Sequence, residues 1–265
     1  MDFGLVVIGD EILSGRREDK HFAKVRELLA ARGLQLAWAR YVGDERQRIE
    51  AALRESFAGD DVVFCCGGIG ATPDDHTRQA AAAALGAPLV LHPEAQALIT
   101  ERCAEMAREG RGSADMTRPE NRQRLRMGEF PQGARIVPNP FNRIPGFSVG
   151  SHWFVPGFPV MAWPMIEWVL DTHYQRFFFE RPVAVLAFIV RGLPESVITP
   201  ALESVEQAFP GVRVFCLPTA GVQGRPGQIE LGVKGDPRQV DAACQVLRES
   251  VSQLGGEIGE MPPAG

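Results

Sequence analysis

Apolar residues in the first third of the chain form strand-like runs that alternate with segments of helical spacing. Residues 3–8 and 61–66 are almost continuously apolar, and residues 34–42 form another strand-like segment. A continuous apolar run is typical of a strand buried on both faces. Helical patterns follow these strands in residues 19–32, after Asp44, and in residues 77–85. This alternation predicts an α/β fold with a mostly parallel sheet covered by helices on both faces.

A change of pattern near residue 180 divides the chain into two predicted domains. The first, residues 1–178, is completed by predicted helices at 93–108, 117–127 and 160–177 and predicted strands at 134–137 and 151–155. The second, residues 182–258, has a β-α-β-β-α pattern that predicts a small α+β domain. The chain after Gly255 is expected to be frayed, and residues 259–265 are predicted to form a flexible tail.

Composition and charge narrow the partners that this protein can have. The formal net charge of -5 argues against the basic surface that nucleic-acid binding requires. Five cysteines without a C-x-x-C pair indicate reduced thiols in a reducing compartment. The sequence has no signal-peptide pattern and no apolar stretch of the ~20 residues that a membrane helix needs. We therefore expect a cytoplasmic protein without nucleic-acid or membrane partners.

A glycine-rich loop, residues 67–77, follows the third predicted strand and precedes a helix. Ligands bind beyond the carboxyl ends of parallel strands, and the free N–H groups at a helix start favour phosphate. Glycines let the backbone approach such a ligand, and hydroxyl groups add donors. The loop supplies both in Gly67, Gly68, Gly70, Thr72 and Thr77. Since it has neither a Gly-Lys-Ser/Thr sequence nor the third glycine of the dinucleotide motif, a plain structural turn is the alternative.

Four carboxylates are predicted to converge at the same edge of the sheet. Glu11 follows the first strand, Asp44 follows the second, and Asp74 and Asp75 lie in the glycine-rich loop. Clustered carboxylates repel a phosphate unless both share a hard divalent cation. The sequence therefore predicts a phosphate-bearing ligand bound with Mg²⁺ or a similar cation. In the simpler interpretation, Asp44 and Asp74 are helix N-caps and the acids of the loop are solvated.

Two other polar residues of these loops have open roles. Ser14 could contact the same ligand or serve only in a turn, and His76 could be a base or an exposed loop residue. The remaining histidines show no metal-ligand spacing, and the chain has no G-x-S-x-G sequence. The sequence therefore gives no support to a serine-nucleophile enzyme.

The sequence around these residues resembles a known family. Residues 8–15, 42–45 and 67–77 are similar to the MoaB/Mog molybdopterin-binding domain, in particular to the version at the start of the CinA (competence/damage-inducible protein A) family. Residues 145–147 and 155–159 also match, so the resemblance covers about residues 3–176. The second predicted domain resembles, more faintly, the KH-like domain that follows in CinA proteins.

The resemblance implies a three-layer α/β/α domain with its ligand at the edge that carries the glycine-rich loop. Some members of the family bind molybdopterin and adenylylate it with Mg-ATP, whereas CinA-type members are associated with metal-dependent hydrolysis of ADP-ribose. Asp44 and Asp75 match the paired acids of the family site, so they are the candidate catalytic and metal-binding residues. The candidate ligand-binding residues are Glu11, Ser14, Gly67, Gly68, Gly70, Thr72, Asp74, Thr77, Arg143, Pro156 and Gly157.

Three functions follow from this resemblance and stay open. The chain binds molybdopterin or a related phosphorylated pterin, or it is a metal-dependent nucleotide pyrophosphatase, or it is a non-catalytic regulatory module. Arg143 supports the third, because many CinA proteins have Gly-Thr-Ala at positions 142–144, although its guanidinium could also pair with a phosphate. Related domains form dimers or trimers, so we expect a homo-oligomer.

Two features of CinA and KH proteins are not expected in this chain. CinA proteins often continue into an amidase domain, which this sequence lacks, so we expect no amide hydrolysis of nicotinamide mononucleotide. Residues 221–224 spell the G-x-x-G clamp of KH domains, but they lie between two predicted strands rather than two helices. We interpret them as a hairpin connection, and the second domain as a packing or dimerisation unit.

Overall fold

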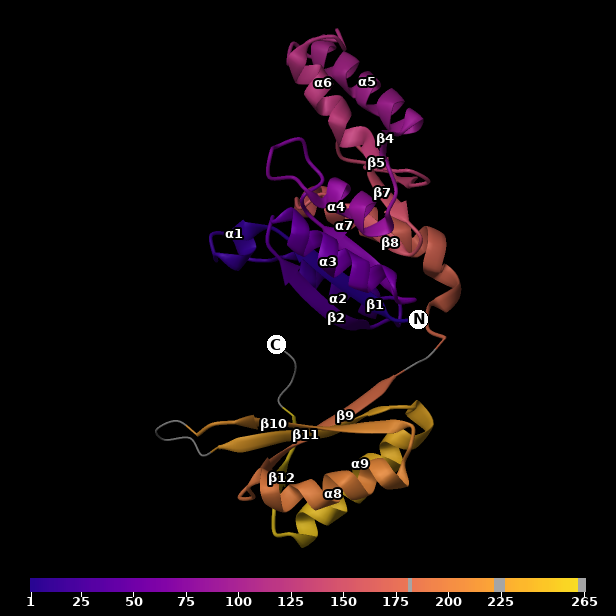
Figure 1. The fold of residues 1–265 in the computed structure, drawn as a ribbon. Coiled ribbons are helices and arrows are strands. Elements are labelled where there is room, and N and C mark those ends of the chain that lie inside the picture. The colour runs from indigo at the N-terminus through magenta and orange to yellow at the C-terminus, as the bar shows by residue number, and fades with distance from the viewer. Residues whose placement is uncertain (181–182, 222–226, 262–265) are drawn as a thin grey trace. The chain divides into compact units, whose positions relative to one another are not determined.

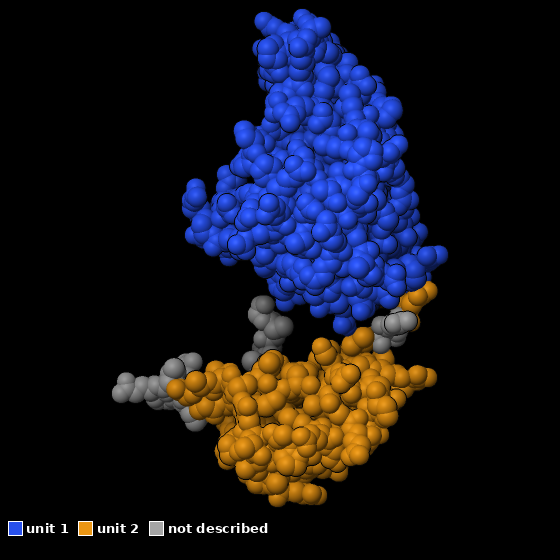
Figure 2. Space-filling view, in the orientation of Figure 1, with its two compact units in different colours: residues 1–178 blue, residues 179–265 orange. Residues whose placement is uncertain are grey.

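The computed structural model describes residues 1–180, 183–221 and 227–261 of the chain. The chain divides into two compact units, Met1–Phe178 and Phe179–Gly265 (Figure 2). The buried residues of each unit form hydrophobic clusters within that unit. The two units are therefore separate packing units, and the candidate site lies in the first.

A six-stranded sheet in the order β2-β1-β3-β8-β7-β6 forms the centre of the first unit (Figure 1). Its strands are β1 (Phe3–Ile8), β2 (Leu36–Val42), β3 (Val62–Cys66), β6 (Arg135–Val137), β7 (Gly146–Val149) and β8 (His152–Val155). The pairs β2-β1, β1-β3 and β3-β8 are parallel, whereas β7 runs antiparallel to both β8 and β6. The predicted mostly parallel sheet is confirmed.

Helices cover both faces of this sheet, as the continuous apolar strands predict. Leu5 and Val7 of β1 pack with α2 (His21–Ala30) and α7 (Pro159–Val169). Val6 and Ile8 point to the other face, where α3 (Arg46–Phe57) and α4 (Thr77–Leu85) cover them. Because successive side chains of a strand face opposite sides, both sets of β1 residues are buried. The first unit is therefore a three-layer α/β/α domain.

A helical lobe extends beyond α4 at one side of the first unit (Figure 1). It consists of β4 (Leu89–Leu91), α5 (Pro93–Arg108), α6 (Pro119–Leu125) and β5 (Glu129–Pro131), with β4 and β5 paired antiparallel. Pro119 is in the first turn of α6 as predicted, but the hydroxyl of Thr117 does not cap the helix and donates to Asp115 instead. Ala95 and Phe130 join this lobe to the core beneath α3 and α4.

The second unit is an antiparallel sheet in the order β10-β11-β9-β12 with two helices. Its elements are β9 (Ala184–Arg191), α8 (Glu195–Ala208), β10 (Val212–Thr219), β11 (Gln228–Gly235), α9 (Pro237–Gln253) and β12 (Glu257–Gly259). Apolar residues of α8 and α9 share one core with the strands. Residues 222–224 of the G-x-x-G sequence and residues 262–265 of the predicted tail lie outside the described residues.

Two expectations about single elements were wrong, and one strand was not predicted. The segment after Gly255 was expected to be frayed, but Glu257–Gly259 pairs with β9 as β12. The helix expected over residues 160–177 ends at Val169 and continues as the π-helical turn Leu170–Tyr174 and the 3-10 turn Gln175–Phe177. Strand β7 was not predicted, because glycines at both of its ends interrupt its apolar pattern. In the described part of the chain, no helix has the length and hydrophobicity to span a membrane.

Candidate functional site

The carboxyl ends of four neighbouring strands, β2, β1, β3 and β8, lie at the same edge of the sheet. We call the segments that follow them the rim: residues 43–44, 9–11, 67–77 and 156–157. Backbone bonds tie these segments together, from Gly9 N to Val42 O at 3.0 Å and from Gly67 N to Val155 O at 3.0 Å. Because ligands of parallel sheets bind at this edge, the rim is the candidate site.

The glycine-rich loop turns sharply where it leaves β3. Gly67 and Gly68 have φ angles of 111° and 67°, in the left-handed region that favours glycine. A Cβ atom at Gly67 would collide with the carbonyl oxygen of Ile8 on the neighbouring strand. Thr77 closes the turn: its N–H donates to Gly68 O and its hydroxyl to Gly67 O, both at 3.0 Å. Thr77, predicted as a ligand contact, is fully buried and shapes the loop.

Asp75 holds the second half of the glycine-rich loop. Its carboxylate accepts hydrogen bonds from the backbone N–H of Thr72, at 2.9 Å, and from the Thr72 hydroxyl. One carboxylate oxygen also lies 2.5 Å from the position that a Cβ atom of Gly70 would take. Gly70 is therefore required by close packing against Asp75. The predicted residues Gly70, Thr72 and Asp75 form one cluster within the loop.

Asp44 and Asp10 bridge the ends of β2 and β1 with reciprocal hydrogen bonds. The N–H of Asp10 donates to Asp44 Oδ2 at 2.9 Å, and the N–H of Asp44 donates to Asp10 Oδ1 at 3.2 Å. Asp44 is not the N-cap of α3, because Glu45 occupies that position without a side-chain bond. The sequence analysis did not select Asp10. Its position, directly before Glu11 and after β1, was the signal that could have identified it.

Burial and neighbouring acids raise the pKa of Asp44. Burial is the largest cause that raises this pKa, and the negative charges of Asp10, Glu11 and Asp74 raise it further, against the hydrogen bond from the Asp10 backbone. Glu11 and Asp74 are thus among the charges that act on Asp44, whereas Asp75 is not. Within the described residues, no group of three or more His, Cys, Asp or Glu side chains is arranged to hold a metal ion.

Replacing Asp44 by asparagine should stabilise the protein slightly at pH 7. A carboxyl whose folded pKa is raised loses stability as pH rises through its titration range, because the folded state disfavours the charged form. Asparagine removes that charge and can still accept from Asp10 N. Because Asp44 is only partly buried, we expect a gain below about 1 kcal/mol, or ~2–4 °C in Tm. Thermal unfolding at pH 7 and pH 3 measures it, and an equal gain at both pH values would contradict this explanation.

Arg78 is a residue of this region that the sequence analysis missed. Its side chain is 2% exposed, and its guanidinium donates to Gly70 O at 2.6 Å and to Arg126 O. Burial lowers its pKa, and the charges of Glu129 and Asp75 oppose that effect. Gln123 of α6 also donates to Ala71 O. The glycine-rich loop is thus attached to the helical lobe by two side chains that start from different elements.

The other predicted residues lie around this cluster in different ways. Gly157 packs against the glycine-rich loop, since a Cβ atom there would be 3.4 Å from Gly67 Cα, and Pro156 precedes it at the end of β8. Ser14 ends the short helix α1 (Asp10–Leu13) and is exposed. Arg143 has a left-handed φ of 64° and pairs with Glu105 of α5 at 2.8 Å. Its guanidinium is therefore already bound to a carboxylate of the helical lobe.

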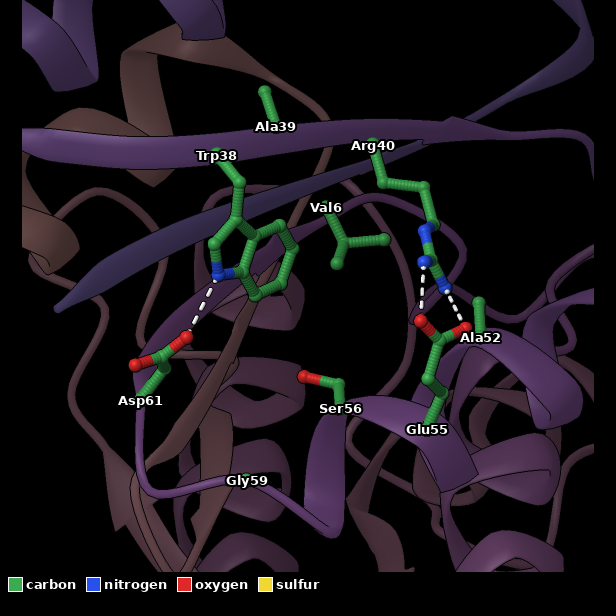
Figure 3. A pocket seen from close by; sticks show the side chains of 9 residues that line it. All are labelled: Val6, Trp38, Ala39, Arg40, Ala52, Glu55, Ser56, Gly59 and Asp61. Carbon is green, nitrogen blue, oxygen red and sulfur yellow. Dashed lines mark hydrogen bonds and ion pairs between the residues drawn. The ribbon is translucent and has the colours of Figure 1, made fainter.

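Two of the pockets in the first unit lie at different ends of the sheet. A pocket of about 430 Å³ lies against the rim, where Glu11, Gly157 and Phe158 contribute to its wall. The pocket of Figure 3, about 300 Å³, lies at the opposite end of the strands, near the start of β3. Its polar groups bind one another, Trp38 Nε1 with Asp61 at 2.8 Å and Arg40 with Glu55 at 2.8 and 2.9 Å. It therefore offers fewer free groups than the rim.

Comparisons with known proteins agree with this fold. A family described as a probable molybdopterin binding domain matches residues 4–175. A CinA-like protein from Geobacter metallireducens is 34% identical over 229 residues, covering 84% of this chain and 53% of that protein. A CinA-like protein from Anaeromyxobacter sp. is 34% identical over 246 residues, covering 86% and 57%. The chain thus spans a little more than half the length of these relatives.

A solved structure supports the same assignment. The crystal structure of the protein CinA from Thermoplasma acidophilum, described as of unknown function, superimposes with a TM-score of 0.54 and 26% identity. It covers 64% of this chain and 98% of that chain, so the likeness is confined to part of the present molecule. The chain therefore belongs to the family of probable molybdopterin-binding domains, as a MoaB/Mog-type domain similar to that of the CinA-like proteins.

Proposed function

We propose that the rim binds a phosphorylated pterin or nucleotide, with its phosphate at the glycine-rich loop. The observation that carries this proposal is the free backbone of residues 68–71. Among the described residues, none of these four N–H groups has a hydrogen-bond acceptor in the chain. They lie next to the start of α4, a helix of nine residues whose positive dipole end attracts anions. The family's molybdopterin binding makes a pterin the first ligand to test.

A divalent cation would complete this site, and the chemistry of the rim fits one. Asp10, Glu11, Asp44 and Asp74 gather negative charge, and none of them has an ion pair among the described residues. Mg²⁺ usually takes one or two carboxylates and completes its shell with phosphate oxygens and water. In such a site, phosphate oxygens of the ligand and water would supply the coordination that the carboxylates leave open. A bound cation would neutralise the phosphate and polarise it.

Thermal unfolding with candidate ligands tests this proposal. Molybdopterin, ADP-ribose and AMP would each be added with and without Mg²⁺. A ligand at a hundredfold excess over its Kd stabilises the protein by about 2.7 kcal/mol. We expect a shift that requires Mg²⁺ and is largest with the true ligand. If no phosphorylated compound changes the unfolding temperature, the proposed binding function is wrong.

Replacing Asp75 by asparagine should weaken binding by roughly 1–3 kcal/mol, or about 5- to 150-fold in Kd. The carboxylate orders the glycine-rich loop through two hydrogen bonds from Thr72 to the same oxygen, Oδ2, and a neutral amide oxygen accepts such bonds more weakly than a charged carboxylate does. Calorimetric titration measures the change. Asp60→Asn is a matched control, because Asp60 is exposed and precedes β3 at the opposite end of the sheet. Unchanged affinity in Asp75→Asn would remove Asp75 from the site.

A metal-dependent pyrophosphatase acting on ADP-ribose is the second candidate function. The crowding of carboxylates around Asp44 favours it, because such acids can hold a cation against both phosphates. The test is whether AMP is released from ADP-ribose in the presence of Mg²⁺ or Mn²⁺, measured by chromatography. Asp44→Asn and Asp75→Asn should each abolish release under this hypothesis. Binding without release would leave the chain as a ligand-binding protein.

A further inference from the structure

The pocket of about 430 Å³ beside the rim has a wall that suits a flat aromatic ring. Phe158 lines this pocket and leaves 56% of its surface exposed, so its ring is accessible to a ligand. The pocket meets the glycine-rich loop directly, because Gly157 lines it and packs against Gly67. A ligand with its phosphate at the loop would therefore have its organic part within reach of Phe158.

His21 fixes the segment that carries Phe158. The ring of His21 is buried in the pocket wall, and its Nε2 lies 3.0 Å from the carbonyl oxygen of Gly157. Since a carbonyl oxygen only accepts, Nε2 carries the hydrogen and donates it. The carbonyl of Phe158 accepts from the backbone N–H groups of Met161 and Ala162 in the first turn of α7. The backbone of Gly157 and Phe158 is thereby attached to two elements, α2 and α7.

Glu11 supplies a hydrogen-bond acceptor in the same pocket. Its side chain is half-buried, and no Lys, Arg or His of the described residues forms an ion pair with it. A half-buried carboxylate without a partner favours a ligand that donates hydrogen bonds. The exposed cations Arg17 and Lys20 line the pocket as well and attract an anionic ligand.

We propose that this pocket binds an amino-substituted heteroaromatic ring, a pterin or a purine, stacked on Phe158 with its amino group donating to Glu11. The inference rests on the proposed function, because it places the ring of the ligand whose phosphate lies at the glycine-rich loop. Pterins and purines share this chemistry: each is a flat π-system that stacks on aromatic side chains. Stacking on Phe158 and donation to Glu11 are independent contacts that separate variants can remove.

Calorimetric titrations of the full chain with Mg²⁺ test the stacking contact. The probes are AMP and neopterin monophosphate, which carry a ring, and ribose 5-phosphate, which does not. Phe158→Ala should weaken the ringed ligands by roughly 5- to 150-fold, as one stacked base is worth about 1–3 kcal/mol, and leave ribose 5-phosphate unchanged. Leu85→Ala is the control, since Leu85 is also exposed but ends α4 far from the loop. The wild-type affinities for AMP and for neopterin monophosphate show whether a purine or a pterin ring is preferred.

A second pair of probes tests Glu11. IMP has an oxo group where AMP has an amino group, so wild type should bind AMP more tightly, and Glu11→Gln should reduce that preference. Two results would overturn the inference: AMP and ribose 5-phosphate binding equally to wild type, or Phe158→Ala weakening all probes alike. If no probe binds, ribose 5-phosphate included, the proposed function itself fails. Binding of ribose 5-phosphate without a ring effect overturns only the inference.

Discussion

Replacing Arg78 by methionine is expected to destabilise the first unit by roughly 2–4 kcal/mol. The guanidinium donates to the carbonyl oxygens of Gly70 and Arg126, and the side chain is buried. Methionine fills a similar volume but leaves both acceptors without a donor, at a cost of about 1–3 kcal/mol each. Removing a buried charge returns part of that cost, because burial disfavours the charged form and lowers the Arg78 pKa. The urea concentration at half-unfolding measures the net change.

The same substitution should weaken ligand binding, although Arg78 is buried and does not face a ligand. Its two hydrogen bonds join the glycine-rich loop to the turn Arg126–Gly128 that follows α6. Without them the loop must be ordered when the ligand binds, which costs affinity. Arg78→Lys is an informative comparison, because the compact ammonium group of lysine can donate to one of the two carbonyl oxygens more easily than to both. If the free energy of unfolding of Arg78→Met stays within about 0.5 kcal/mol of the wild-type value, the two carbonyl oxygens must find other donors.

Arg78 also illustrates what the sequence could not predict about the site. As the second residue of α4, it follows a glycine-rich loop and has the pattern of a solvated helix start. Its burial depends on two carbonyl oxygens, and one of these belongs to a residue 48 positions away. No periodicity encodes such a distant acceptor. Asp10 is the opposite case, since its position after β1 parallels that of Asp44 after β2 and could have been found.

The sequence predicted the fold correctly where a run of several residues has one consistent apolar pattern. The runs of β1 and β3 are apolar on both faces, which only a sheet covered by two helical layers can bury. This placed the ends of β1, β2 and β3 together, and hence Glu11, Asp44 and the glycine-rich loop. The prediction failed where a segment distant in the sequence determines the local structure. Strand β12 has only three residues, and it exists because β9 has a free edge for it.

Acidification should destabilise the first unit through His152. This ring is buried against Phe57, with 4.3 Å between ring centroids, and its Nε2 lies 2.6 Å from Ser56 Oγ. Burial lowers the pKa of His152 to about 4, although the negative charge of Asp61 opposes the shift. The unfolded chain, with an ordinary histidine pKa near 6.5, therefore binds the proton more readily between pH 4 and pH 6.5. Stability must fall as pH is lowered through that window.

The expected loss is large enough to separate from other titrations. A difference of about two and a half pKa units corresponds to roughly 3 kcal/mol. Urea unfolding at pH 7.5 and pH 4.5 would measure the total, to which carboxyl groups also contribute. His152→Gln isolates the histidine, because its amide can replace the Nε2 contact with Ser56 and does not titrate. The variant should lose distinctly less stability than wild type over the same interval. Parallel losses in both proteins would mean that the His152 pocket admits the proton at little cost, so the ring is less well enclosed than its 3% exposure indicates.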